Sequence, residues 1–250
     1  MEDNLKSVFI KPDNENIKIW RFLDFPKFAS MLDKHSLFFS NAVKMGDAFE
    51  GALPKSNLDG IKTMFEKAGM PLEQISKQIK LSIDNFDVKN MYLLNCWHMN
   101  DDESDLMWKK YVSNGFGVAI QSTFKKIESA FSDNSKVWMG IVRYIDYQKD
   151  SIPIGNGFHQ FLHKRKNFSD ERELRLITYY DITSFTTPSK DALNSIIGKH
   201  VEVKLDDLIE KIYVSPNSPD WFSELVSSVS KKFGIDKPII KSSISTSPDY

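Results

Sequence analysis

The sequence predicts a single α+β domain with mixed, mostly antiparallel sheets and flanking helices. Segments with strand and helix patterns are interspersed without the regular βαβ alternation of a doubly wound sheet. The 250 residues are 41% hydrophobic and 27% charged, an ordinary globular composition, and no Pro/Gly-rich linker or internal repeat divides them. We therefore expect one globular domain over residues 17–241, a polar segment before it (1–16) and a flexible, Ser-rich tail after it (242–250).

The first half of the sequence begins with a strand, a helix and a second strand. Residues 17–22 alternate with a period of two, which is typical of a strand with one buried face. The run 91–98 is almost wholly apolar and predicts a central strand that is buried on both faces. In chain order, the expected elements are a strand (17–22), a helix (25–34), a strand (35–40), a loop (44–54), a helical region interrupted near Gly69 (58–83) and a strand (91–98).

The second half predicts shorter elements. A helix that carries Met107 and Trp108 is expected to be capped at Asp101 or Asp102. The long apolar segment further along the chain predicts one continuous strand over residues 136–146. The other expected elements are a strand (116–120), a helical or irregular segment (158–166), a strand (172–179), a surface loop (181–195), two strands joined by a turn (200–205 and 209–214) and an amphipathic helix (220–233).

Charge and cysteine content exclude several classes of protein. Lys and Arg number 33 against 34 Asp and Glu, so the chain has no overall basic field to attract nucleic acid or anionic lipid. Cys96 is the single cysteine, which excludes an intramolecular disulfide and leads us to expect a buried thiol in a reducing compartment. No signal-peptide core is seen, and no stretch approaches the roughly 20 apolar residues that span a bilayer. We expect a cytoplasmic protein without a membrane partner, and the sequence leaves its oligomeric state open.

The familiar catalytic motifs are absent from the sequence, which has no G-x-G-x-x-G, P-loop, H-E-x-x-H or G-x-S-x-G. Among the five histidines, only His159 and His163 have a spacing that suits a shared metal on a helix. Because no third ligand lies near them in the sequence, we expect surface histidines and no metal.

The segment from His163 to Arg175 is the most unusual local pattern. Three cations precede a predicted strand on which Glu171, Glu173 and Arg175 occupy alternate positions and share one face. Two carboxylates beside cations form a site that can hold and act on a polar substrate. Spacing alone nevertheless favours a solvated edge strand with weak surface ion pairs, and periodicity alone favours an outward side chain for Arg21.

Several short motifs occur in a fixed order over roughly residues 17–214. They are Trp20-Arg21-Phe22, Leu37-Phe38-Phe39-Ser40-Asn41, Asp47-Ala48-Phe49-Glu50, Cys96-Trp97-His98, Met107-Trp108-Lys109-Lys110-Tyr111, residues 115–120, and Lys164 with Phe168, Glu171, Glu173 and Arg175. Together they resemble a bacterial family known only as domain of unknown function 2971, which implies no activity. The family's loop usually reads Phe-Asn-Asp-Pro-Phe-Glu. Gly46 and Ala48 depart from that pattern here, which puts the rigidity of the loop in doubt.

A second resemblance does imply chemistry. An arginine on a first strand, a serine that ends the next strand and a later Glu-x-Glu strand are similar to the arginine–serine–glutamate arrangement of ADP-ribosyltransferases. The resemblance implies that Arg21 binds NAD phosphate, Ser40 supports the nicotinamide ribose, Glu173 holds the ribose 2′-hydroxyl and Glu171 faces the acceptor. It further implies NAD as substrate, and it places the remaining candidates for nucleotide binding at Lys164, Trp97, Trp108 and Tyr111.

These patterns support three hypotheses. The first is an NAD-consuming ADP-ribosyltransferase or glycohydrolase. The second is a protein that acts on nucleic acid in phage defence or stress, suggested by the basic run 163–166 and by Lys109-Lys110. The third is a non-catalytic module that binds a small ligand or a protein. The first hypothesis requires that Arg21 and Glu173, which are far apart in the sequence, border the same hollow.

Overall fold

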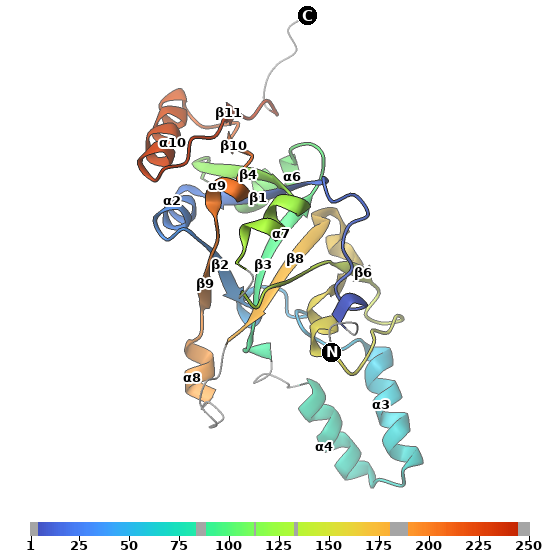
Figure 1. The fold of residues 1–250 in the computed structure, drawn as a ribbon. Coiled ribbons are helices and arrows are strands. Elements are labelled where there is room, and N and C mark those ends of the chain that lie inside the picture. The colour runs from blue at the N-terminus through green and yellow to red at the C-terminus, as the bar shows by residue number, and fades with distance from the viewer. Residues whose placement is uncertain (1–4, 84–88, 113, 133–134, 181–189, 245–250) are drawn as a thin grey trace, which may run out of the picture.

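A branched sheet forms the centre of the computed structural model, which describes residues 5–83, 89–112, 114–132, 135–180 and 190–244 (Figure 1). Within these residues the sheet has nine strands, and a separate parallel ribbon joins β6 (Arg143–Ile145) to β7 (His163–Arg165). All sheet pairings are antiparallel except that of β10 with β11. The nine strands are β1 (Lys18–Asp24), β2 (Ser36–Asn41), β3 (Tyr92–Met99), β4 (Gly117–Thr123), β5 (Trp138–Ile141), β8 (Glu173–Tyr179), β9 (Gly198–Glu202), β10 (Lys211–Val214) and β11 (Ile239–Lys241).

Helices flank this sheet, which confirms the expected α+β class with a mostly antiparallel sheet. None of the described helices is long and apolar enough to cross a membrane. The α-helices are α2 (Phe25–Asp33), α3 (Lys55–Lys67), α4 (Leu72–Ile83), α6 (Asp105–Tyr111), α7 (Phe124–Ala130), α8 (Lys190–Ser195), α9 (Leu205–Leu208) and α10 (Asp220–Lys232). The 3-10 helices are η1 (Ala42–Lys44), η2 (Gly157–Phe161) and η3 (Lys166–Glu171).

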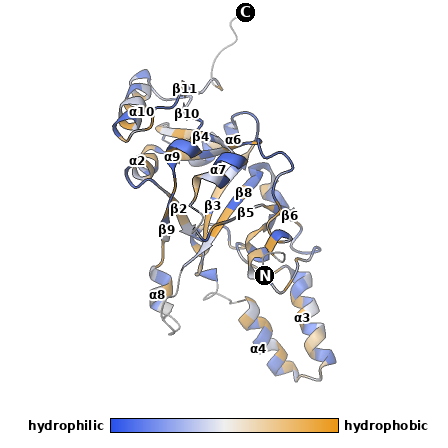
Figure 2. Cartoon of the chain, in the orientation of Figure 1, coloured by the Kyte–Doolittle hydropathy of each residue, from blue (hydrophilic) through white to orange (hydrophobic). Residues whose placement is uncertain are grey.

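Most of the longer elements agree with the sequence patterns. The expected strands 17–22, 35–40 and 91–98 correspond to β1, β2 and β3, and the helices 25–34 and 220–233 to α2 and α10. The interrupted helical region is the hairpin of α3 and α4, which extends away from the sheet in Figure 1. Strand β3 is central, as expected, because it pairs with β1, β2 and β8, and Figure 2 shows it as largely hydrophobic.

Several boundaries differ from the expectations because tertiary hydrogen bonds decide them. The single strand 136–146 is wrong: β5 pairs with β8 and β6 with β7, and the break falls at buried Val142, whose N–H bonds to the carbonyl of Glu173. The cap of α6 is Ser104, whose hydroxyl accepts from the N–H of Met107, and not Asp101 or Asp102. The expected turn after residue 205 is the short helix α9, and the segment 158–166 divides into η2 and β7.

Two stretches of the expected organisation lie partly outside the described residues. The loop predicted over 181–195 is described only from residue 190, where α8 begins, and the tail 242–250 only as far as residue 244. The polar segment before β1 is described from Leu5, and Val8 and Phe9 are buried in a hydrophobic cluster against β3 and η2.

The candidate site lies where β1 separates from β3. Strand β1 pairs with β4 along all seven of its residues, but with β3 only at Ile19–Met99 and Trp20–His98. Beyond Trp20, β1 therefore stays with β4 and separates from β3. The two faces of β1 pack against different layers: α6 covers Trp20 and Phe22, whereas the opposite face contributes to the main core with α2, α7, α9 and α10.

Candidate functional site

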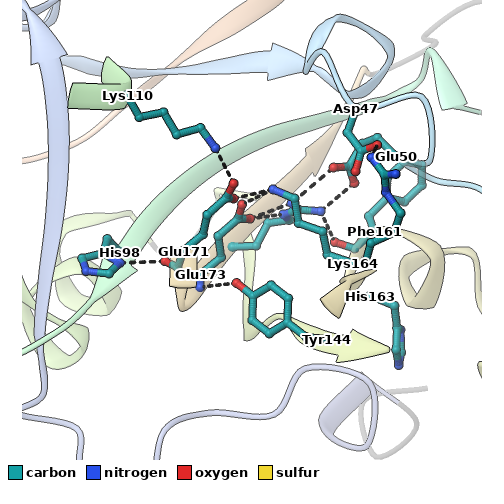
Figure 3. A network of polar contacts seen from close by, with 12 residues as sticks. Asp47, Glu50, His98, Lys110, Tyr144, Phe161, His163, Lys164, Glu171 and Glu173 are labelled. Atoms are coloured by element: carbon teal, nitrogen blue, oxygen red, sulfur yellow. Dashed lines mark hydrogen bonds and ion pairs between the residues drawn. The ribbon is translucent and has the colours of Figure 1, made fainter. Parts of the chain in front are cut away.

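Four buried charged side chains form a network at the beginning of β8 (Figure 3). The ammonium Nζ of Lys164 lies 2.5 Å from Oε2 of Glu171 and 2.6 Å from Oε1 of Glu173. Arg175 donates to Oε2 of Glu173 from Nη2 at 2.6 Å and from Nε at 3.0 Å. All four residues are at most 8% exposed. The solvated edge strand that spacing alone favoured is therefore wrong, because β8 lies between β3 and β5 and its charges are buried.

Further contacts tie this network to the loop after η1. Arg175 donates to Glu50 from Nη1 at 2.6 Å and from Nη2 at 3.3 Å, and to the carbonyl of Phe161 at 2.7 Å. Glu171 also accepts from Lys110 on α6. In the same loop, Asp47 accepts from the guanidinium of Arg165 at 2.8 Å. These ion pairs hold the loop whose rigidity the Gly46 and Ala48 substitutions put in doubt.

The two glutamates reach Lys164 from different local structures. Glu173 and Arg175 share one face of β8, as the sequence predicts, but Glu171 is the last residue of η3. Between them Arg172 adopts a left-handed conformation with φ +39°, which few non-glycine residues adopt. The expectation of three side chains along one strand is therefore wrong for Glu171, although its carboxylate still joins the same network.

The surroundings shift the pKa values of Glu171 and Glu173 in opposite directions. Burial opposes ionisation of Glu173, but Arg175 and Lys164 outweigh it and hold its pKa well below the ordinary value. The pKa of Glu171 is raised by burial and by the neighbouring carboxylate of Glu173. Burial also opposes the charge of Lys164, yet the attraction of Glu173 raises its pKa. Glu173 is thus a fixed anion at neutral pH, and Glu171 is the carboxyl that binds a proton more readily.

A cavity of about 240 Å³ lies beside the network, where β1 separates from β3. Its walls come from β1, α2, β2, β3, α6 and the start of β8. The lining residues are Trp20, Arg21, Phe22, Leu23, Lys27, Phe38, Ser40, Cys96, Trp97, His98, Met107, Tyr111 and Glu173. Residues as far apart in the sequence as Trp20 and Glu173 therefore meet at one hollow.

Arg21 borders this cavity with part of its guanidinium unoccupied. Nη1 donates to Oδ1 of Asn95 at 2.8 Å and to the carbonyl of Cys96 at 2.9 Å, and the guanidinium carbon lies 6.0 Å from the centre of the Trp97 ring. No acceptor in the described part of the chain contacts its Nε or Nη2. The side chain is half-buried, so the outward arginine that periodicity alone favoured is wrong. Burial lowers the pKa of this guanidinium, which is consistent with a cation that lacks an anionic partner.

The structure divides the other candidate residues into three groups. Ser40, Trp97 and Tyr111 border the cavity together with Arg21 and Glu173. Glu171 and Lys164 do not border it and instead support the carboxylate of Glu173. Trp108 is not brought to the cavity. Its ring packs edge-on against Phe22 at 5.0 Å, and its indole N–H donates to Glu103.

Asn95 is a site residue that sequence reasoning missed. It is buried in β3, where its Oδ1 accepts from Arg21 and from the indole N–H of Trp97, and its Nδ2 donates to the carbonyl of Phe38. Asn95 thus fixes the arginine relative to β2. A polar residue inside a predicted buried central strand is the signal that could have identified it.

The basic residues that suggested a nucleic-acid interface are paired within the protein. Lys164, Arg165 and Lys110 contact carboxylates of the network and its loop. In addition, Lys166 lies 3.7 Å from Asp150 and Lys109 lies 2.6 Å from Asp105. Such pairing reduces the positive charge that this surface offers to a phosphate backbone. Nucleic-acid binding stays an untested alternative.

The two histidines with metal-like spacing are buried and not on the surface as expected. Their ring centres are 6.0 Å apart, and Nδ1 of His163 contacts the carbonyl of His159 at 2.6 Å. Within the described ranges, no group of three or more His, Cys, Asp or Glu side chains has an arrangement that could hold a metal ion.

Cys96 is expected to react slowly with iodoacetamide in the folded protein. It borders the cavity but is half-buried, and burial raises the pKa of its thiol to about 12. At pH 8 this leaves about 10³-fold less thiolate than an unperturbed cysteine with a pKa of about 8.5. Mass spectrometry of timed reactions, with and without urea, measures the difference. Equal alkylation rates in the folded and unfolded protein would contradict it.

Neither a protein-family model nor a curated protein matches the chain. Two solved structures of DarT from Thermus sp. 2.9 are similar to it. The structure in complex with NAD+ has 9% sequence identity and a TM-score of 0.42, covering 92% of this chain and 96% of that one. The structure in complex with carba-NAD+ has 10% identity and a TM-score of 0.38, covering 91% and 96%. Similarities of this size carry no functional conclusion, so the function has to be inferred from the cavity and the charged network themselves.

Proposed function

We propose that this protein is an ADP-ribosyltransferase-like enzyme that cleaves the bond between nicotinamide and ribose in NAD and transfers ADP-ribose to an acceptor. One observation carries the proposal: Arg21, Ser40 and Glu173, from three separate strands, border the same cavity. An arginine and a glutamate that line one cavity suit a ligand with an anionic part and a part that becomes cationic during the reaction.

Glu173 is suited to stabilise that cationic part. When the glycosidic bond breaks, its electron pair stays on the nicotinamide nitrogen, and positive charge develops on the ribose, as in glycoside hydrolysis. A carboxylate that accepts a hydrogen bond from the neighbouring ribose hydroxyl stabilises this charge. Oε2 of this carboxylate already accepts twice from Arg175, but Oε1 accepts only from Lys164 and has a second lone pair, and the side chain borders the cavity.

Arg21 is suited to hold the diphosphate. Its Nη1 is fixed on β3 by Asn95 and Cys96, so Nε and Nη2 are positioned to donate to an anion in the cavity. A planar guanidinium binds two phosphate oxygens at once, which positions the bond to be broken. Lys27 of α2 also lines the cavity, but its ammonium lies 2.5 Å from the carboxylate of Asp24.

Glu171 receives a different role from the one that the family resemblance implies. Because it does not border the cavity, we assign it to holding Lys164 and Lys110 and not to contact with an acceptor. The acceptor nucleophile forms its new bond to the ribose carbon from which nicotinamide has departed with the bonding electron pair, and its proton passes to solvent or to a base on the acceptor.

The first experiment measures release of free nicotinamide from NAD by the purified protein, together with NAD binding by calorimetry. Arg21→Lys keeps the charge but loses the paired donors, so we expect a ten- to hundredfold rise in KM or Kd, the effect of about 1.5–3 kcal/mol from a charged hydrogen bond. Arg143→Lys, on the separate ribbon, is the matched control and should behave as the wild type.

Two outcomes would change the conclusion. A wild-type protein that neither binds nor cleaves NAD refutes the proposal. Binding without any release of nicotinamide, with or without candidate acceptors, would identify a nucleotide-binding module in place of an enzyme.

A further inference from the structure

A second cavity, of about 370 Å³, adjoins the one that contains Glu173. The two share four lining residues, which are Arg21, Leu23, Lys27 and Phe38. The shared border therefore carries the guanidinium of Arg21, one aromatic ring and the exposed ammonium of Lys27, which is paired with Asp24. Beyond it, the second cavity extends over α2, β2 and β9 and is mostly apolar, with Pro26, Met31 and Leu37 in its wall.

We propose that this second cavity binds the purine base of a dinucleotide, and that Phe38 and His200 are its recognition residues. The inference rests on the proposed function, because it assigns the other half of the same ligand. A molecule with two ring systems joined by a diphosphate matches two hollows that meet at Arg21, a cation without an anionic partner. A mononucleotide would fill only one of them.

Phe38 and His200 form an aromatic wall of this second cavity. They are directly opposite each other in the pairing of β2 with β9, and their ring centres are 5.1 Å apart. Phe38 is 36% exposed, although its neighbours Leu37 and Phe39 are buried. Exposed aromatic rings are platforms on which nucleobases stack.

The local backbone positions the Phe38 ring. Gly198 lies beside it on β9, where an added Cβ would come within 2.5 Å of Cζ of Phe38 and 2.3 Å of the carbonyl oxygen of Phe39. Glycine at this point leaves room for the ring beside β9. The orientation of the platform is thus set by the pairing of β2 with β9.

Polar groups at the same place suit the edge of a base. The hydroxyl of buried Ser36 lies 2.9 Å from Nδ1 of His200 and fixes the imidazole. His200 is exposed, no partner in the described ranges contacts its Nε2, and partial burial together with Lys34 lowers the pKa of the ring and favours its neutral form. A neutral imidazole offers a donor or an acceptor to the base, depending on its tautomer.

The test compares ligands that occupy one cavity or both. Calorimetry with NAD, nicotinamide mononucleotide and AMP would be done on the wild type, on His200→Ala and on Phe38→Ala. We expect His200→Ala to weaken the binding of AMP and of NAD at least about fivefold and to leave the binding of nicotinamide mononucleotide unchanged. Loss of one stacked ring lowers affinity by about five- to hundredfold. Phe38→Ala should weaken AMP by more. Circular dichroism and Tm confirm that each variant is folded, and His35→Ala, a neighbouring histidine outside both cavities, is the matched control.

The outcomes separate this inference from the proposed function. If NAD and nicotinamide mononucleotide bind the wild type equally and His200→Ala changes neither, the base subsite is wrong and the proposed function stands. If AMP binds in a manner sensitive to His200 but no nicotinamide nucleotide binds or is cleaved, the subsite stands and the proposed function is wrong. Loss of all three ligands in His200→Ala would also overturn the subsite, because it would show a general defect.

Discussion

Replacing Glu173 by Gln is expected to lower the rate of nicotinamide release by two to three orders of magnitude. Glutamine has nearly the same shape but no charge, so it cannot stabilise the cationic ribose, and loss of one preorganised electrostatic group costs about 10²–10³ in rate. NAD binding should change much less, because the proposed function assigns the diphosphate to Arg21, which lies on a different strand. The effect is therefore expected in kcat and not in KM.

The measurement is initial release of nicotinamide by the wild type and the variant, together with calorimetry of NAD binding to both. Glu210→Gln is the matched control, because Glu210 pairs with partly exposed Lys18 away from the cavity. A variant that keeps the wild-type rate would remove Glu173 from the reaction. Equal losses of rate and of NAD binding would instead indicate that the substitution disturbs the whole site.

Replacing Arg175 by Met is expected to destabilise the protein by about 3–5 kcal/mol, the cost of removing one partner from a buried ion pair. Arg175 is fully buried and is the shared partner of Glu173 and Glu50. Without it, two buried carboxylates lose their main counter-charge. Urea unfolding at pH 7 measures the change, and Lys11→Met, which removes one partner of an exposed pair with Glu128, should cost no more than about 1 kcal/mol.

A double variant tests the cause of that loss. Adding Glu50→Gln to Arg175→Met removes one of the two uncompensated charges and should recover part of the stability, whereas additive losses would contradict the electrostatic explanation.

The pH dependence has a definite sign. The folded-state pKa of Glu173 lies below its unfolded value of about 4.3, so its stabilisation is present above that value and is lost as the pH falls through the folded pKa. Glu171 has a raised folded-state pKa, so the stability that it contributes is present at low pH and is lost as the pH rises through that pKa.

Local patterns in the sequence were sufficient for the fold class and for most longer elements. Burial of one face or of both determines where apolar residues occur along an element. The sequence shows this in the apolar run of β3, the alternation of β1 and the periodicity of α2 and α10. Arg21 and Glu173 were singled out by their resemblance to the arginine–serine–glutamate arrangement of ADP-ribosyltransferases, whereas spacing and periodicity alone favoured solvent-exposed positions for both.

What only the tertiary structure decided is which of these charged groups meet and which face the cavity. Arg21 was expected outward on periodicity alone, yet the separation of β1 from β3 leaves it bordering the hollow with two donors unused. Trp108 was expected at the ligand, yet the packing of α6 on β1 buries it beside Phe22. These outcomes depend on strand pairing between residues far apart in the chain. The free energy of that pairing comes from contacts that no local window of sequence contains.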